Sequence, residues 1–205
     1  MPACAIIAIA PSAERHPIEP CEAHLVFDYY NRLSARQQSI YRQSDEIKQL
    51  RLPRPAELQP LVTGLEPALQ SGDRRDVERI CQTVADGIVA QLNAPAVRVN
   101  VLAVRPSDDW GELHGLYLPE EDGKDARIQV WMRTAKHKKT VAFRSFLRTV
   151  LHELCHHLDY EFFHFPETLH TEGFYNRESS LFHQLLPQVK TSAKTAVSPS
   201  ERQRR

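Results

Sequence analysis

The stretch VAFRSFLRTVLHELCHHLDYEFF, residues 141–163, decides the fold. Its apolar side chains recur every three or four residues, which is the period of an α-helix. They form one stripe, made of Phe143, Leu147, Val150, Leu151, Leu154 and Leu158. The spacing predicts a helix that packs this stripe on a core and leaves its other face free for chemistry. Pro166 prevents the helix from continuing far beyond His164.

The same helix carries the segment His-Glu-Leu-Cys-His at positions 152–156. Histidines four residues apart lie on one side of a helix, with Cβ atoms about 5 to 6 Å apart. His152 and His156 can therefore bind one metal ion, for which zinc is the expected choice. Glu153 lies a quarter turn away from His152, from where it can act as a general base on a metal-bound water.

A catalytic zinc normally takes three protein ligands and leaves one position for water, so a third ligand is expected downstream. The candidates are His164, His170, Glu172, Glu178 and His183. We favour His170, because it follows the break at Pro166, where the chain can turn back towards the histidine pair. Glu172 and Glu178 stay open as alternatives. For Asp159, one turn beyond His156, a hydrogen bond to a ligand imidazole and a solvated surface position are both open.

The flanking sequence predicts an α+β protein. A helix from Asp73 to Leu92 precedes three strands, at about 97–103, 113–118 and 127–133, whose apolar residues alternate. Their short connections favour a small, mainly antiparallel meander. A last helix begins at Thr171 as a cap and ends at about Leu186, before Pro187.

We expect four parts along the chain: a tail at 1–21, a helical region at 22–70, a domain at 73–187 that holds the motif helix, and a tail at 188–205. The last tail is basic and almost free of apolar residues, which predicts disorder. The first residues include a short apolar run but no basic segment before it, so an intracellular protein is expected rather than a secreted one.

The segments HELCHHLD, 152–159, and LHTEGFYNRESSL, 169–181, resemble the SprT-like and WLM-type zincins, in which a third histidine opens the helix after the H-E-x-x-H helix. The resemblance implies a zincin-like metallopeptidase domain with His152, His156 and His170 as zinc ligands and Glu153 as catalytic base. It also implies that Phe174 packs beneath the site and that the segment Ile128–Arg133 is an edge strand that pairs with an extended substrate. The C-x-x-C zinc ribbon of many SprT-like proteins is absent, so their role in DNA repair is not carried over.

Composition limits the partners. Lys and Arg together number 26, as do Asp and Glu, so net charge points neither to nucleic acid nor to an anionic membrane. The basic segment 136–139 gives only weak support for a nucleic-acid partner. The four cysteines lack close spacing, which favours a reducing, cytoplasmic location, and no apolar stretch approaches the roughly 20 residues of a membrane span.

The sequence thus predicts a zinc-dependent metallopeptidase that acts on a protein or peptide. Two alternatives stay open: a catalytically silent zincin-like module that binds or regulates a partner, and a metal-dependent hydrolase of a non-peptide bond. Tyr160, Tyr175 and Arg177 are candidates for stabilising an oxyanion.

Overall fold

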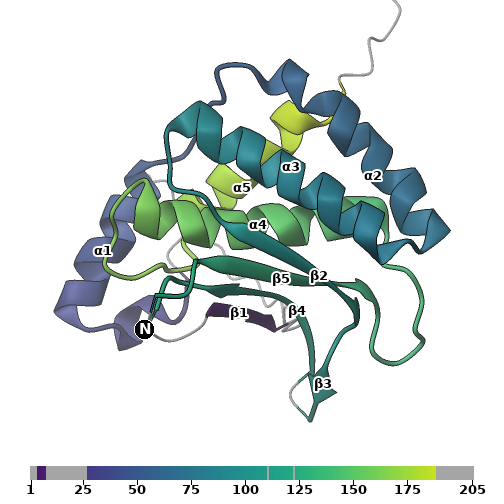
Figure 1. The fold of residues 1–205 in the computed structure, drawn as a ribbon. Coiled ribbons are helices and arrows are strands. Elements are labelled where there is room, and N and C mark those ends of the chain that lie inside the picture. Colours follow the sequence, from purple (N-terminus) through teal and green to yellow (C-terminus); the bar gives the residue numbers. More distant parts are fainter. Residues whose placement is uncertain (1–3, 8–26, 110, 122, 188–205) are drawn as a thin grey trace, which may run out of the picture.

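The computed structural model describes residues 4–7, 27–109, 111–121 and 123–187. Helices α1 (Ala35–Glu46), α2 (Gln59–Ser71) and α3 (Arg74–Leu92) precede the strands β2 (Arg98–Val104), β3 (Ser107–Asp108), β4 (Gly111–Leu118) and β5 (Arg127–Arg133). Helices α4 (Phe143–Glu161) and α5 (Glu172–Leu185) follow, and β1 (Cys4–Ile7) comes from the start of the chain. Two short 3-10 helices lie at Tyr30–Arg32 and Pro55–Glu57. The α+β class is confirmed, and α2, α3 and α4 lie on one side of a curled sheet (Figure 1).

The helix ends follow local chemistry. Asp73 caps α3 by accepting from the backbone N–H groups of Arg75 and Asp76, and Thr171 caps α5 by accepting from that of Phe174. Ser34 forms a capping box with Gln37 at the start of α1. Within the helical region expected at 22–70, the first α-helix therefore begins after Ser34, and residues 22–26 lie outside the described part.

The sheet is mixed, with the order β1-β4-β5-β2. β5 pairs antiparallel with β4 and parallel with β2. The sheet is mainly antiparallel, as predicted, because β1–β4, β3–β4 and β4–β5 are antiparallel pairs. The predicted meander order is wrong, since β2 pairs with β5 and not with β4, and the prediction that Ile128–Arg133 is an edge strand is also wrong. Ile128, Val130 and Met132 are buried on one face of β5, and Trp131 is buried on the other face, where Arg133 is exposed. β4 pairs with one side of β5, and β2 pairs with the other side.

Helix α4 occupies the centre of the molecule. Every residue from Thr149 to Asp159 is buried, because α5 packs on this helix opposite β4 and β5. The expectation of one packed and one free face is therefore wrong. His152, His156, His157 and Asp159 are buried because each finds a hydrogen-bond partner outside α4, and Glu153 is the exception described below. Among the described residues, every helix is too short or too polar to cross a lipid bilayer.

The helical region before residue 73 shares its core with the rest of the described chain. Leu58, Val62 and Leu65 belong to the same buried cluster as Leu151 and Leu181. Helix α1 lies against α5, where the backbone N–H of Gly173 donates to Asp45 Oδ1 at 2.8 Å. The side chains of Ser44 and Thr171 are hydrogen-bonded at 3.0 Å.

Gly173 permits this close approach of α1 and α5. A Cβ at this position would overlap the backbone of Ser44 and Asp45, which cannot rotate away. Gly173→Ala is therefore expected to lower the free energy of unfolding by about 1–3 kcal/mol, measured by chemical denaturation. Gly64→Ala in α2 is the matched control, because a Cβ there meets no atom within 4 Å. It should raise stability by about 0.5–1 kcal/mol, and equal effects of the two substitutions would contradict the packing argument.

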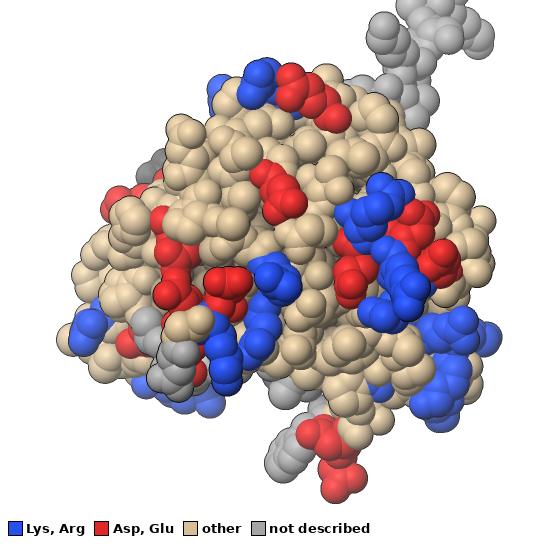
Figure 2. Space-filling model, in the orientation of Figure 1, with Lys and Arg blue, Asp and Glu red and all other residues tan. Residues whose placement is uncertain are grey.

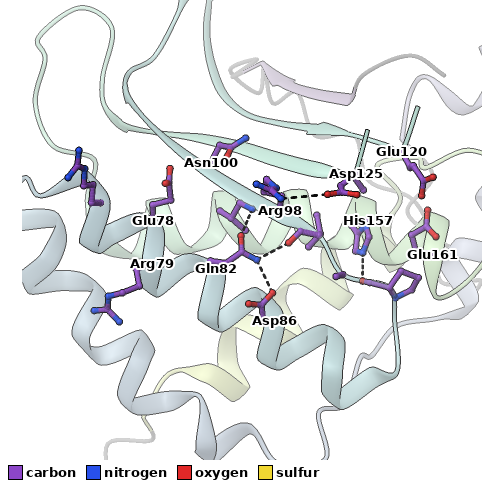
Figure 3. Close-up of a pocket in the computed structure, with 16 residues that line it drawn as sticks. Glu78, Arg79, Gln82, Asp86, Arg98, Asn100, Glu120, Asp125, His157 and Glu161 are labelled. Atoms are coloured by element: carbon purple, nitrogen blue, oxygen red, sulfur yellow. Dashed lines mark hydrogen bonds and ion pairs between the residues drawn. The ribbon is translucent and has the colours of Figure 1, made fainter. Parts of the chain in front are cut away.

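The outer edge of β2 is closed by side chains of α3. The backbone N–H of Val99 donates to Gln82 Oε1 at 2.7 Å, and that of Val101 donates to Glu78 Oε2 at 2.8 Å. Gln82 Nε2 in turn donates to the Val97 carbonyl at 2.9 Å (Figure 3). These bonds replace those of a neighbouring strand, so this edge of the sheet is not open to pairing with another chain.

Candidate metal centre

Three histidines from two segments converge on one point. His152 and His156 come from α4, and His170 comes from the connection between α4 and α5. The Nε2 atom of His170 lies 2.9 Å from that of His152 and 3.1 Å from that of His156. Within the described residues, these three form the one group of histidine, cysteine and acidic side chains whose ligand atoms come close enough to hold a metal ion.

The opposite ring nitrogens are held by polar side chains. His152 Nδ1 lies 3.1 Å from Glu178 Oε2, and a carboxylate oxygen accepts, so the proton of this imidazole sits on Nδ1. His156 Nδ1 lies 2.8 Å from Thr168 Oγ1. That hydroxyl already donates to Asp159 Oδ2 at 2.8 Å, so it accepts from His156. In the neutral form of each ring, Nε2 therefore directs a lone pair at the centre.

Burial keeps two of these rings uncharged. Desolvation lowers the pKa of His156 well below its ordinary value, and the neighbouring histidines add to the effect. Desolvation likewise lowers the pKa of His170 to about 4, with a further contribution from His152. Nitrogen lone pairs about 3 Å apart repel one another unless a proton or a cation lies between them. The residues present therefore fit a cation that prefers imidazole ligands.

Aromatic rings surround the three histidines. The ring of Phe174 is fully buried and lies 4.8 Å from the His152 ring and 4.7 Å from the His156 ring, measured between centroids. This is the position beneath the site that was expected for Phe174. Tyr175 stacks on His170 with an angle of 19° between the rings and is 41% exposed. It forms part of the outer rim of the cluster.

Glu153 is buried, and among the described residues its carboxylate has little polar compensation. Within the described part of the chain, neither of its carboxylate oxygens makes a hydrogen bond. Desolvation raises its pKa well above the ordinary value, and the charge of Glu178 adds to this; the backbone of Tyr117 opposes the shift. The carboxylate lies against β4 at Gly115, where a Cβ would overlap it. A carboxyl group with a raised pKa is suited to exchanging protons near neutral pH.

Removing this charge should stabilise the metal-free protein. Because the pKa of Glu153 is raised in the folded state, its favourable protonated form exists at low pH, and the stability is lost as the pH rises through the folded-state pKa. Glu153→Gln should therefore match the parent protein near pH 4 and exceed it in free energy of unfolding by about 1–3 kcal/mol near pH 9. Denaturation with a chelator present measures this difference. A difference independent of pH would contradict the assignment.

The other residues that the sequence offers as metal ligands or their supports do not belong to the convergent group. Glu172 and Glu178, the alternative third ligands, are not part of the convergent group. Glu178 is buried and bonds His152 and Arg148, with Arg148 at 2.9 Å. His164 and His183 are exposed. Asp159 is buried and reaches His156 only through Thr168.

Two of the three oxyanion candidates are placed away from the histidines. The guanidinium of Arg177 is fully buried and donates to Asp159 Oδ1 at 2.7 Å and to the Ser44 carbonyl at 2.7 Å. Tyr160 packs on Tyr117. Tyr175 is the candidate that flanks the cluster. Sequence reasoning missed Thr168, Arg148 and Gly115, because nothing in their local sequence indicates which element they contact.

A groove of about 680 Å³ opens elsewhere, between α3, β2 and the end of α4 (Figure 3). None of the three convergent histidines lines it. His157 does line the groove, and its Nε2 donates a hydrogen bond to the Pro95 carbonyl at 2.9 Å. Arg98 and Asp125 form an ion pair at 3.7 Å in the same groove. On the face shown in Figure 2, basic and acidic side chains lie next to one another, so this face gives no electrostatic argument for a nucleic-acid partner.

Comparison of the chain with protein families, with curated proteins and with solved structures finds no match.

Proposed function

We propose that the protein is a zinc-dependent hydrolase of peptide bonds with a zincin-like site. The observation that carries the proposal is the convergence of three imidazole Nε2 atoms at the helix that also carries Glu153, whose buried carboxylate oxygens make no hydrogen bond within the described residues. His152, His156 and His170 would hold the metal, and a set of three neutral protein ligands leaves a position for water, as in catalytic zinc sites. Bound zinc would polarise a carbonyl group and make water more acidic.

Glu153 supplies the proton transfer. Its Oε1 or Oε2 takes a proton from the attacking water and returns it to the nitrogen of the leaving amine, so that one carboxyl group acts first as base and then as acid. Its burial between α4 and β4 excludes the bulk water that would otherwise stabilise the charged form. Thr168 and Glu178 hold the ring nitrogens of His156 and His152 that face away from the centre.

The choice of a peptide bond is supported by β4. This strand lies against Glu153 at Gly115, and its outer edge already pairs with an extended chain, β1. An edge strand recognises a peptide through the backbone groups that every peptide has. The same geometry is compatible with the predicted SprT-like or WLM-type zincin, whose third histidine and following phenylalanine correspond to His170 and Phe174.

The test combines metal analysis with a search for cleavage. Purified protein is expected to contain one equivalent of zinc and to cut a complex mixture of peptides, with the new ends identified by mass spectrometry. Failure to bind zinc would overturn the proposal. One equivalent of zinc without any cleavage would favour the silent binding module.

A further inference from the structure

The outer edge of β4 is covered by the start of the same chain. β1 pairs antiparallel with β4, with Cys4 opposite Tyr117, Ala5 opposite Leu116 and Ile7 opposite Leu113. The register shifts between Ala5 and Ile7. These positions lie in the segment 1–21, which is expected from the sequence to be a tail. The backbone pairing is thus short and irregular.

The pairing of β1 with β4 spans Gly115, the β4 residue that contacts Glu153, the proposed general base. Gly115 lies between the β4 residues that face Ala5 and Ile7, and it is the position where a Cβ would overlap the Glu153 carboxylate. A strand added to this edge therefore passes the point where β4 meets α4. β1 follows that path in the structure (Figure 1).

The described part of the sheet has no other edge at which an extended peptide could pair. α3 side chains close the outer edge of β2, and β5 is paired on both sides. An extended peptide that is to pair with the sheet near Glu153 must therefore use the edge of β4 that β1 occupies.

We propose that β1 is a built-in competitor that holds the substrate edge of β4 until it is displaced. The proposal rests on the peptidase function proposed above. A tethered strand acts at an effective concentration on the order of 1 mM, so it outcompetes a peptide present at micromolar concentration. Because β1 has four residues and an irregular register, its pairing is weak enough to open. The apparent affinity for substrate is then reduced by the fraction of molecules in which the edge is open.

The test removes the backbone pairing without shortening the chain. In an antiparallel pair, neighbouring residues direct their N–H groups to opposite sides, so one of Cys4 and Ala5 must donate towards β4. The double variant Cys4→Pro, Ala5→Pro lacks both donors. The matched control places two prolines outside β1, as Ala13→Pro, Glu14→Pro. All proteins are studied with zinc bound.

Two measurements are made on each protein. Hydrogen exchange of the backbone amides in residues 113–117 should become faster in the Cys4→Pro, Ala5→Pro variant and stay unchanged in the control, while residues 127–133 of β5 stay protected in both. For peptide hydrolysis, kcat/KM of the variant should rise by at least about tenfold, which corresponds to an edge that is open in about 10% of parent molecules. A synthetic peptide of residues 1–10 should inhibit the variant competitively.

The outcomes separate the two proposals. Unchanged exchange at 113–117 in the variant would overturn the role of β1, as would faster exchange with unchanged kcat/KM. If no protein cleaves any peptide, the peptidase proposal fails, and saturable binding of the labelled 1–10 peptide to the variant but not to the parent would still support β1 as the occupant of the edge. Lack of such binding would overturn it. If the variant does not fold, inhibition of the parent protein by the 1–10 peptide only at concentrations above about 1 mM would support the role of β1, and no inhibition at such concentrations would overturn it.

Discussion

Replacement of His170 by alanine should lower the affinity for zinc by at least about 100-fold, which exceeds the 10- to 100-fold loss typical of removing a residue that only orients a ligand. The reason is that Nε2 of His170 lies within 3.1 Å of both other Nε2 atoms, so its loss leaves two protein ligands for the metal. Competition with a chromophoric chelator measures the dissociation constant, and metal analysis of the purified variant measures the zinc content.

His164→Ala is the matched control. His164 lies in the same connection between α4 and α5 but is exposed, so its removal should leave the zinc affinity within about twofold of the parent value. If His170→Ala bound zinc as tightly as the parent protein, the third ligand would have to be sought again at Glu172 or Glu178.

Glu153→Gln should keep one equivalent of zinc and lose about 10²- to 10⁴-fold in kcat, the range expected for removal of a general acid–base group. Glutamine has nearly the same shape as glutamate, so the packing against Gly115 of β4 is preserved. Its amide cannot accept and return a proton. Initial rates of peptide cleavage, measured at equal zinc content, separate this loss from a loss of metal.

Glu161→Gln serves as the control for this substitution, since Glu161 lies at the end of the same helix and lines the groove shown in Figure 3. Its activity should equal that of the parent. Full activity of Glu153→Gln would mean that another group moves the proton, and the assigned role of this residue would have to be abandoned.

The helices and strands could be predicted closely because their signals are local. The alternation of apolar residues gives β5 its observed bounds, Arg127–Arg133, and Asp73 and Thr171 cap the helices that they were expected to cap. The pairing of strands could not be predicted in this way. Alternation shows that a segment is extended but not which neighbour it meets, and the parallel contact of β2 with β5 joins segments separated in sequence by β4.

Helical geometry alone places His152 and His156 on the same side of α4, and the break at Pro166 explains why His170 can return to them. The residues that surround the three histidines could not be predicted from the sequence in the same way. Glutamates are mostly exposed, yet Glu178 is buried, and His152 and Arg148 both bond it. Thr168 and Gly115 act through contacts made only in the folded chain.

The guanidinium of Arg177 connects the first helix to the surroundings of the three convergent histidines. It donates to the carbonyl groups of Ser44 and Ile47 at the end of α1, and also to Asp159, whose other oxygen accepts from Thr168. A fragment that starts at residue 73 would keep the ion pair of Arg177 with Asp159 but would lack the Ser44 and Ile47 acceptors, which leaves guanidinium N–H donors without partners at a cost of about 1–3 kcal/mol. Recombinant versions of this protein trimmed to the histidine-bearing segment would thus lose the scaffold that aligns His156, and the smallest useful fragment must retain α1.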